Sequence, residues 1–121
     1  MQTLKIMQSM DRDDDTIRIL ACEGYMNFET YDYAMDIVNR LIQHGINRIV
    51  FDLSEVEYIS SSGWAVFLGP SNTARSFGGD VKIAAMKDQV KFVFEALELN
   101  NVIESYDTVE KAVAAFKKKG N

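Results

Sequence analysis

The stretch NRIVFDL, residues 47–53, constrains the fold of this chain more than any other. Its centre, Ile49-Val50-Phe51, is a continuous apolar run rather than an alternating one. Such a run predicts a strand that is covered on both faces, as in parallel sheets. Helix patterns flank it, over residues 28–44 and from Ser62 to about Phe77. The chain is therefore predicted to be an α/β protein with this strand in its core.

The remaining patterns extend this alternation to the rest of the chain. We expect strands at 3–10, 16–23, 47–53, 80–85 and 102–103, and helices at 28–44, 62–77, 87–98 and from Asp107 onward. Strands that alternate with helices predict parallel crossovers. The prediction is a single α/β domain over residues 1–121. It has a mixed sheet of four to five strands with an opening hairpin, packed by about four helices.

Five residues predict where the helices begin, end or bend. Asn27 is placed to cap the first helix, and Gly45 is placed to end it in a left-handed conformation. Asp107 and Glu110 form a capping-box pattern at the start of the last helix. Pro70 has no backbone N–H to donate, so we expect a kink at this residue or a break just before it.

Composition excludes several classes of function. Apolar residues make up 47% of the 121 residues and charged residues 26%, as is typical of a soluble globular domain. No apolar stretch is long enough to cross a bilayer, and the first ten residues do not resemble a signal peptide. A net charge of -5 argues against a nucleic-acid surface or an anionic membrane surface. The lone Cys22 is predicted to be a small buried hydrophobe, and we expect a cytoplasmic protein.

Two runs of like charge stand out. DRDDD, residues 11–15, is predicted to be a solvated hairpin loop, with a divalent-cation site as the alternative. Lys117 to Lys119 are predicted to lie at the end of the last helix, where the helix dipole favours cations. His44 falls at the end of the first helix, with no nearby residue to form a metal or catalytic site. The sequence therefore predicts no metal site.

Three consecutive serines, within YISSSGW at residues 58–64, join the central strand pattern to the second helix pattern. They lie in the segment DLSEVEYISSSG, which is predicted to be the loop at the carboxyl edge of the sheet, where ligand sites gather. One serine is enough to cap the helix. The other hydroxyls are candidates for a nucleophile or for a phosphate acceptor.

The nucleophile hypothesis lacks the supporting residues. A serine nucleophile needs a base and a group that orients it, but the only histidine is His44, on a different helix. The chain has neither a G-x-S-x-G elbow nor an S-x-x-K motif at the serines, and SFGGD is not a phosphate-binding loop. We therefore expect no enzymatic activity, no catalytic residues and no cofactor. A phosphate, by contrast, is stabilised at a helix start, because the free N–H groups there carry partial positive charge.

The segment IVFDLSEVEYISSSGWAVFL resembles the signature of the STAS domain, in the form found in bacterial anti-sigma factor antagonists. Asp52-Leu53-Ser54 matches the first part of that signature and Ser61-Ser62-Gly63 the second. Gly24 and Asn27 resemble the family's segment before the first helix. The strand GGDVKIAAM and the helix TVEKAVAAF also fit, so the resemblance covers nearly the whole chain.

The resemblance implies a partner switch. An unmodified antagonist binds an anti-sigma factor that is also a serine kinase, phosphorylation of the antagonist releases it, and a serine phosphatase restores it. Carried onto this chain, the acceptor is Ser61, with Ser60 and Ser62 as rival acceptors. The rim that binds the partner is expected to contain Asn27, Asp52, Ser54, Ser60, Ser62 and Gly63.

Two residues depart from the family pattern, because Ser60 and Asn27 stand where the family has aspartates. The alternatives are a STAS scaffold module that is not phosphorylated and a STAS domain that binds a nucleotide or another anion. A hydrolase is the weakest alternative.

Overall fold

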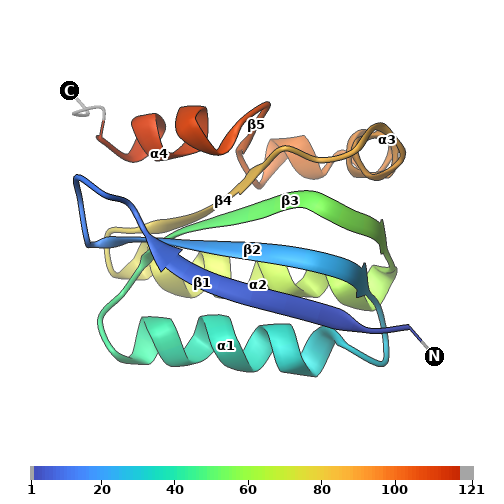
Figure 1. Cartoon of the computed structure of the whole chain (residues 1–121), viewed down its shortest axis with the longest axis horizontal. Coiled ribbons are helices and arrows are strands. Elements are labelled where there is room, and N and C mark those ends of the chain that lie inside the picture. The colour runs from blue at the N-terminus through green and yellow to red at the C-terminus, as the bar shows by residue number, and fades with distance from the viewer. Residues whose placement is uncertain (1, 118–121) are drawn as a thin grey trace.

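The chain folds around one five-stranded sheet with strand order β1-β2-β3-β4-β5, in a computed structural model that describes residues 2–117 (Figure 1). The strands are β1 (Leu4–Met10), β2 (Ile17–Met26), β3 (Arg48–Ile59), β4 (Asp80–Ala84) and β5 (Ser105–Tyr106). β1 and β2 form an antiparallel hairpin, and the other neighbouring strands pair in parallel. This confirms the predicted mixed sheet with an opening hairpin.

Helices cover both faces of the sheet. The α-helices are α1 (Tyr31–Gln43), α2 (Ser61–Ser76), α3 (Asp88–Ala96) and α4 (Val109–Lys117), with a 3₁₀ turn η1 (Leu99–Asn101). Figure 1 shows α1 and α2 on one face and α3 and α4 on the other. No helix within residues 2–117 is long and apolar enough to cross a bilayer.

The central strand is buried from both sides, as its continuous apolar run predicts. Ile49, Val50 and Phe51 are all fully buried. Phe51 belongs to the large core that includes Phe67 of α2, with the two rings packed edge to face at 4.8 Å. Val50 belongs to a second, smaller core that α4 covers. Neighbouring residues of β3 therefore pack against opposite layers.

The predicted loop after residue 53 is wrong, because β3 continues to Ile59. Its register against β2 shifts twice, between Ala21 and Glu23 and between Gly24 and Tyr25. These irregularities insert extra residues into β3, and its buried residues there are spaced by three: Leu53, Val56 and Ile59. A spacing of three departs from the alternation of a regular strand, so the sequence pattern does not reveal that the strand continues.

One other prediction fails, and a second fails in part. The short strand expected at 102–103 lies instead at Ser105–Tyr106, while Ile103 is a buried core residue outside any strand. α2 runs through Pro70, so the break considered there does not occur, and the alternative of a kink stays a prediction. Pro70 is buried, which favours tertiary packing as the reason the helix continues despite the missing hydrogen bond.

Helix starts differ from the predictions by a few residues. α1 begins at Tyr31, and its N-cap is Thr30 rather than Asn27. In α4, Thr108 rather than Asp107 caps the start, since its Oγ1 accepts from the backbone N–H of Lys111 at 3.1 Å. Gly45 does end α1 with a φ of +85°, as predicted. Lys118 and Lys119 lie outside the described residues.

Candidate functional site at the start of α2

Ser60 caps α2 and fastens it to the sheet. Its Oγ accepts a hydrogen bond from the backbone N–H of Gly63 at 3.2 Å, and its carbonyl accepts one from Trp64 at 3.0 Å. Its own N–H donates to the carbonyl of Met26, the last residue of β2, at 2.9 Å. The capping role considered for the serines therefore belongs to Ser60.

Gly63 allows the first turn of α2 to press against the end of β2. A Cβ at this position would lie 2.3 Å from the carbonyl oxygen of Met26 and 2.9 Å from Cγ2 of Ile59. The first of these obstacles is backbone, which a rotamer change cannot move. The absence of a Cβ at Gly63 therefore allows the start of α2, with its serines, to lie against the end of β2.

Ser61 and Ser62 hold hydroxyls that the local structure does not use. Ser61 is exposed at the first position of α2, and Ser62 beside it is half-buried. Neither hydroxyl forms a hydrogen bond within residues 2–117. The first turn of α2 contains no acidic side chain, so its partial positive charge is uncompensated there. The exposed hydroxyl of Ser61 thus lies where an added negative charge is favoured.

Asn27 shapes the neighbouring turn instead of facing solvent. It is buried, and its Oδ1 accepts from the backbone N–H of Glu29 at 2.9 Å. Its Nδ2 donates to Oε1 of Gln2 at 2.6 Å. Thr30 completes this turn by donating from Oγ1 to the carbonyl of Tyr25 at 2.7 Å. Thr30 was missed by sequence analysis, although its position three residues after Asn27 is a recognisable turn signal.

Asp52 and Ser54 lie well away from the serines. Asp52 occupies the last position of β3 that pairs with β4, and its carboxylate accepts from the backbone N–H of Ser54 at 3.0 Å. Ser60 lies six positions after Ser54, just beyond the end of β3, which corresponds to roughly 20 Å along the strand. The structure therefore gathers Asn27 and residues 60–63 at one end of β3 and leaves Asp52 and Ser54 partway along it.

Two aromatic side chains at this end were not expected. Phe28, next to Asn27, is 79% exposed, and Tyr58, two residues before Ser60, is 52% exposed. The ring of Phe28 is 6.3 Å from that of Tyr31. Tyrosine and phenylalanine are enriched at the centres of protein–protein interfaces. No sequence signal marked them, because exposure depends on what the fold places above a side chain.

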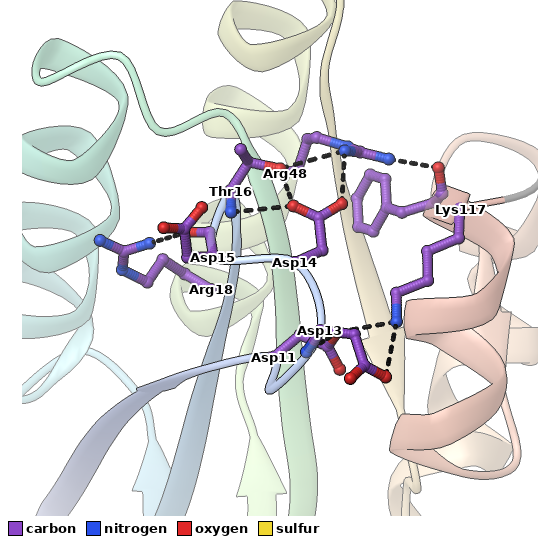
Figure 2. A network of polar contacts seen from close by, with 9 residues as sticks. Asp11, Asp13, Asp14, Asp15, Thr16, Arg18, Arg48 and Lys117 are labelled. Atoms are coloured by element: carbon purple, nitrogen blue, oxygen red, sulfur yellow. Dashed lines mark hydrogen bonds and ion pairs between the residues drawn. The ribbon is translucent and has the colours of Figure 1, made fainter.

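The aspartate loop, residues 11–15, is held by cations from distant elements (Figure 2). Lys117 of α4 lies 2.8 Å from the carboxylate of Asp11 and 3.7 Å from that of Asp13. Arg48 of β3 lies 3.2 Å from the carboxylate of Asp14 and also donates to the carbonyl of Phe116. The predicted solvated hairpin loop is confirmed, with Arg12, Asp13 and Asp15 exposed, but the cation partners of Asp11, Asp13 and Asp14 were not predicted.

Hydrogen-bond partners lower the pKa of two carboxylates in this loop. The hydrogen bond from Lys117 lowers the pKa of Asp11, and that from Thr16 lowers the pKa of Asp14. The hydrogen bond to Asp11 in turn raises the pKa of Lys117. Within residues 2–117, no three His, Cys, Asp or Glu side chains are arranged to hold a metal ion.

The remaining reactive groups do not join the serines. Cys22 is buried in the core, as predicted, and burial raises its pKa to about 12. Nδ1 of His44 contacts the carbonyl of Arg40 at 2.7 Å at the carboxyl end of α1. That end is remote from the Asn27 turn, which precedes α1, and so from the serines. The structure thus assembles no base beside Ser61 in the described part of the chain.

Comparison with known proteins identifies the family. The model of the STAS domain matches residues 8–112. The chain belongs to the STAS domain family. A Bordetella bronchiseptica protein named "Putative anti-sigma factor antagonist BtrV" is 29% identical over 110 residues, which cover 90% of this chain and 93% of that protein. This chain is a STAS protein of the anti-sigma factor antagonist type.

Solved structures share the same fold. An anti-sigma factor antagonist from Mycobacterium paratuberculosis has a TM-score of 0.84 at 16% identity, covering 96% of both chains. The phosphorylated form of the Bacillus cell fate determinant SpoIIAA has a TM-score of 0.70 at 15% identity, covering 92% of this STAS domain and 98% of that chain. At such identities the likeness concerns the fold. Ser60, one of the two residues that depart from the family pattern, caps α2 in this STAS domain.

Proposed function

We propose that this STAS domain is a partner switch controlled by phosphorylation of Ser61. The unmodified protein binds an anti-sigma factor that is also a serine kinase, the kinase phosphorylates Ser61, and the complex separates. A serine phosphatase returns the protein to its binding form. The observation that carries the proposal is the exposed Ser61 hydroxyl at the first position of α2, beside a cap already supplied by Ser60.

The magnitudes favour loss of a partner over loss of the fold. A phosphate adds about -1.5 to -2 charge at neutral pH. At the start of α2 the helix dipole stabilises such a charge by about 0.3–1 kcal/mol. An unpaired charge in a docked interface costs roughly 2–5 kcal/mol. At about 1.4 kcal/mol per tenfold change, binding weakens about 30-fold to several thousand-fold.

The surface around Ser61 sets what a partner contacts. Ser60, Ser62 and Gly63 shape the helix start, and Asn27 positions the adjoining turn. Phe28 and Tyr58 are exposed at the same end and supply apolar contact area. A partner that also reaches Asp52 and Ser54 extends roughly 20 Å along β3. The domain acts in the cytoplasm under this proposal, and it has no catalytic activity of its own.

The test uses single-serine variants and a cognate anti-sigma factor kinase with ATP. Intact mass should rise by one phosphate in the wild type, in Ser60→Ala and in Ser62→Ala, but not in Ser61→Ala. Phosphatase treatment should reverse the change, and Ser61→Asp should weaken capture of the anti-sigma factor at least about 30-fold. Phosphate that persists in Ser61→Ala would contradict the proposal.

Two alternatives give different results in the same assays. A scaffold module would keep an unchanged mass while still binding its partners. A nucleotide- or anion-binding STAS domain would show a thermal shift with nucleotides or inorganic phosphate. Ser61→Asp should reduce that shift, because the bound anion and the new carboxylate would both occupy the start of α2.

A further inference from the structure

The outer edge of β1 presents unpaired backbone groups. The carbonyl of Thr3 accepts from Tyr25 at 2.9 Å, and the N–H of Asp11 donates to Ile17 at 3.1 Å, so odd-numbered residues of this strand bond to β2. Hydrogen-bonding direction alternates along an antiparallel strand. The even-numbered residues therefore point their N–H and C=O groups away from the sheet: Leu4, Ile6, Gln8 and Met10. No strand in the described part of the chain lies beyond β1 (Figure 1).

This edge has one of the features that usually prevent strand pairing, the charge of Lys5, and lacks the others. Natural edge strands are protected by charged side chains, especially lysine, by proline, by bulges or by short length. β1 is seven residues long, has no proline, keeps one register against β2 throughout and carries one charge, on Lys5. Met7 and Met10 are 62% and 52% exposed. A regular edge of this length, with two exposed methionines and a single lysine, favours pairing with another strand.

We propose that a second copy of this chain covers it, with the two β1 strands paired antiparallel about a two-fold axis at Met7. In this register Leu4 faces Met10 of the second copy, and Ile6 faces Gln8. All outward N–H and C=O groups of both strands then gain partners. A two-fold axis at Ile6 or Gln8 leaves one end of each strand unpaired. A shift by one residue would pair even-numbered residues of one copy with odd-numbered residues of the other. That register is excluded, because only the even-numbered residues point their N–H and C=O groups outward.

The charges along the edge are compatible with this register. Lys5 lies opposite the uncharged Ser9 of the second copy and diagonal to its Asp11, on the same face of the joined sheet. No like charges face each other within β1. The Met7 side chains meet across the axis, on a face of β1 where both are exposed. The pairing therefore satisfies the backbone groups of the edge and buries its most exposed apolar residue.

The dimer leaves the candidate site at the start of α2 open in each copy. Leu4, at the start of β1, pairs with Gly24 of β2. Gly24 lies close to Met26, the last residue of β2, whose carbonyl accepts from the N–H of Ser60 at the start of α2. Antiparallel pairing places the Leu4 end of one copy beside the Met10 end of the other, so the two Ser61 residues lie at opposite ends of the joined sheet. This inference is independent of the proposed function and does not require phosphorylation.

A register-specific cross-link tests the proposal on the full chain. In Met7→Cys the two Cα atoms face each other at about 4.5 Å, within reach of a disulfide. Ser9→Cys is the matched control. The new thiol of one copy then lies opposite Lys5 of the other, four positions or about 13 Å along the strand from the second new thiol, so the two thiols cannot form a disulfide. Cys22 is buried and does not interfere. After mild oxidation, Met7→Cys should run as a covalent dimer and Ser9→Cys as a monomer. Equal cross-linking of both variants, or none in Met7→Cys, would overturn the proposal.

Sedimentation or light scattering gives an independent measure. Wild-type protein should be dimeric at high micromolar concentration. Gln8→Pro removes an outward N–H without touching the ladder to β2, and it should raise the dimer dissociation constant about tenfold or more, whereas Gln8→Val should not. Met7→Lys places like charges opposite each other and should have a similar effect. A wild-type protein that stays monomeric at all concentrations would assign the edge to a different partner and sink the dimer.

Discussion

The two ends of the sheet carry short polar stretches that the fold uses in opposite ways. At one end, residues 60–62 are serines, and only Ser60 is used by the local structure. At the other end, residues 11–15 contain four aspartates, and three of them pair with Arg48 or Lys117. The serine end thus leaves the Ser61 hydroxyl exposed, whereas the aspartate end uses its charges to hold α4 and the β1–β2 hairpin together. Composition alone does not distinguish a site from a structural clamp.

We expect the largest loss of stability at the serine end, in the variant Gly63→Ala. The added Cβ would meet the carbonyl oxygen of Met26 at 2.3 Å, so α2 must move away from the sheet. Overpacking of this kind costs about 3 kcal/mol of unfolding free energy. The matched control is Gly69→Ala in the same helix, where no atom outside the flanking residues and the helix's own backbone lies within 4 Å of the new Cβ. Alanine favours a helix over glycine by about 0.5–1 kcal/mol, but the ring of Pro70 crowds a Cβ at the preceding residue, so this variant should change stability by less than about 1 kcal/mol. Urea unfolding of both variants measures the difference, and equal effects would contradict the close approach at Gly63.

At the aspartate end, Arg48→Met should be the most damaging single change. It removes bonds to the Asp14 carboxylate, to the Thr16 hydroxyl and to the carbonyl of Phe116. Loss of charged hydrogen bonds at a partly buried position costs about 2 kcal/mol. Arg40→Met is the control, since Arg40 forms an exposed pair within α1 that is worth about 0.5 kcal/mol or less. Similar losses in the two variants would show that the clamp contributes no more than a surface ion pair.

Ser60→Ala and Ser61→Ala should separate the cap from the exposed hydroxyl. Ser60→Ala leaves the N–H of Gly63 without its acceptor and should cost about 1 kcal/mol. Ser61→Ala removes a hydroxyl with no hydrogen bond in the described structure, so its stability should stay within about 0.5 kcal/mol of the wild type. Thermal unfolding compares the two. If Ser61→Ala proves the more damaging, the assignment of roles must be reversed.

The smallest effect is a pH dependence confined to the aspartate end. The pKa of Asp11 is lowered from its ordinary value of 3.8, so the stability that its pairing supplies is present above that pH and is lost as the pH falls through the folded pKa. The pKa of Lys117 is raised above 10.5, so its contribution is present below that pH and is lost as the pH rises through the folded pKa. The gap in Tm between wild type and Lys117→Gln should therefore be constant from about pH 5 to 9 and narrow at both extremes.

Lys91→Gln is the control for this prediction. Lys91 lies 3.9 Å from Asp107 in an exposed pair away from the aspartate loop. Its Tm should follow that of the wild type at every pH. A gap between wild type and Lys117→Gln that does not narrow in acid would mean that Asp11 is not the partner that matters.

Patterns confined to a few turns of chain were predictable. The helix start at the serines, the left-handed Gly45 and the alternation of strands and helices all follow from neighbouring residues. The second half of β3 was not predictable, because its irregular pairing with β2 changes which residues are buried. Asn27 was expected on the rim but is buried, since its hydrogen bond to Gln2 joins residues that are 25 positions apart.

The sequence by itself determined the order of the elements, the doubly covered central strand and the helix that opens at three serines, because hydrophobic period, caps and turns act over short distances. Tertiary structure alone decided which serine is used as a cap, which hydroxyl stays exposed and which cations the aspartates meet. These outcomes depend on side chains from distant parts of the chain. Lys117 pairs with Asp11, which lies 106 positions earlier in the chain, and no local pattern encodes that contact.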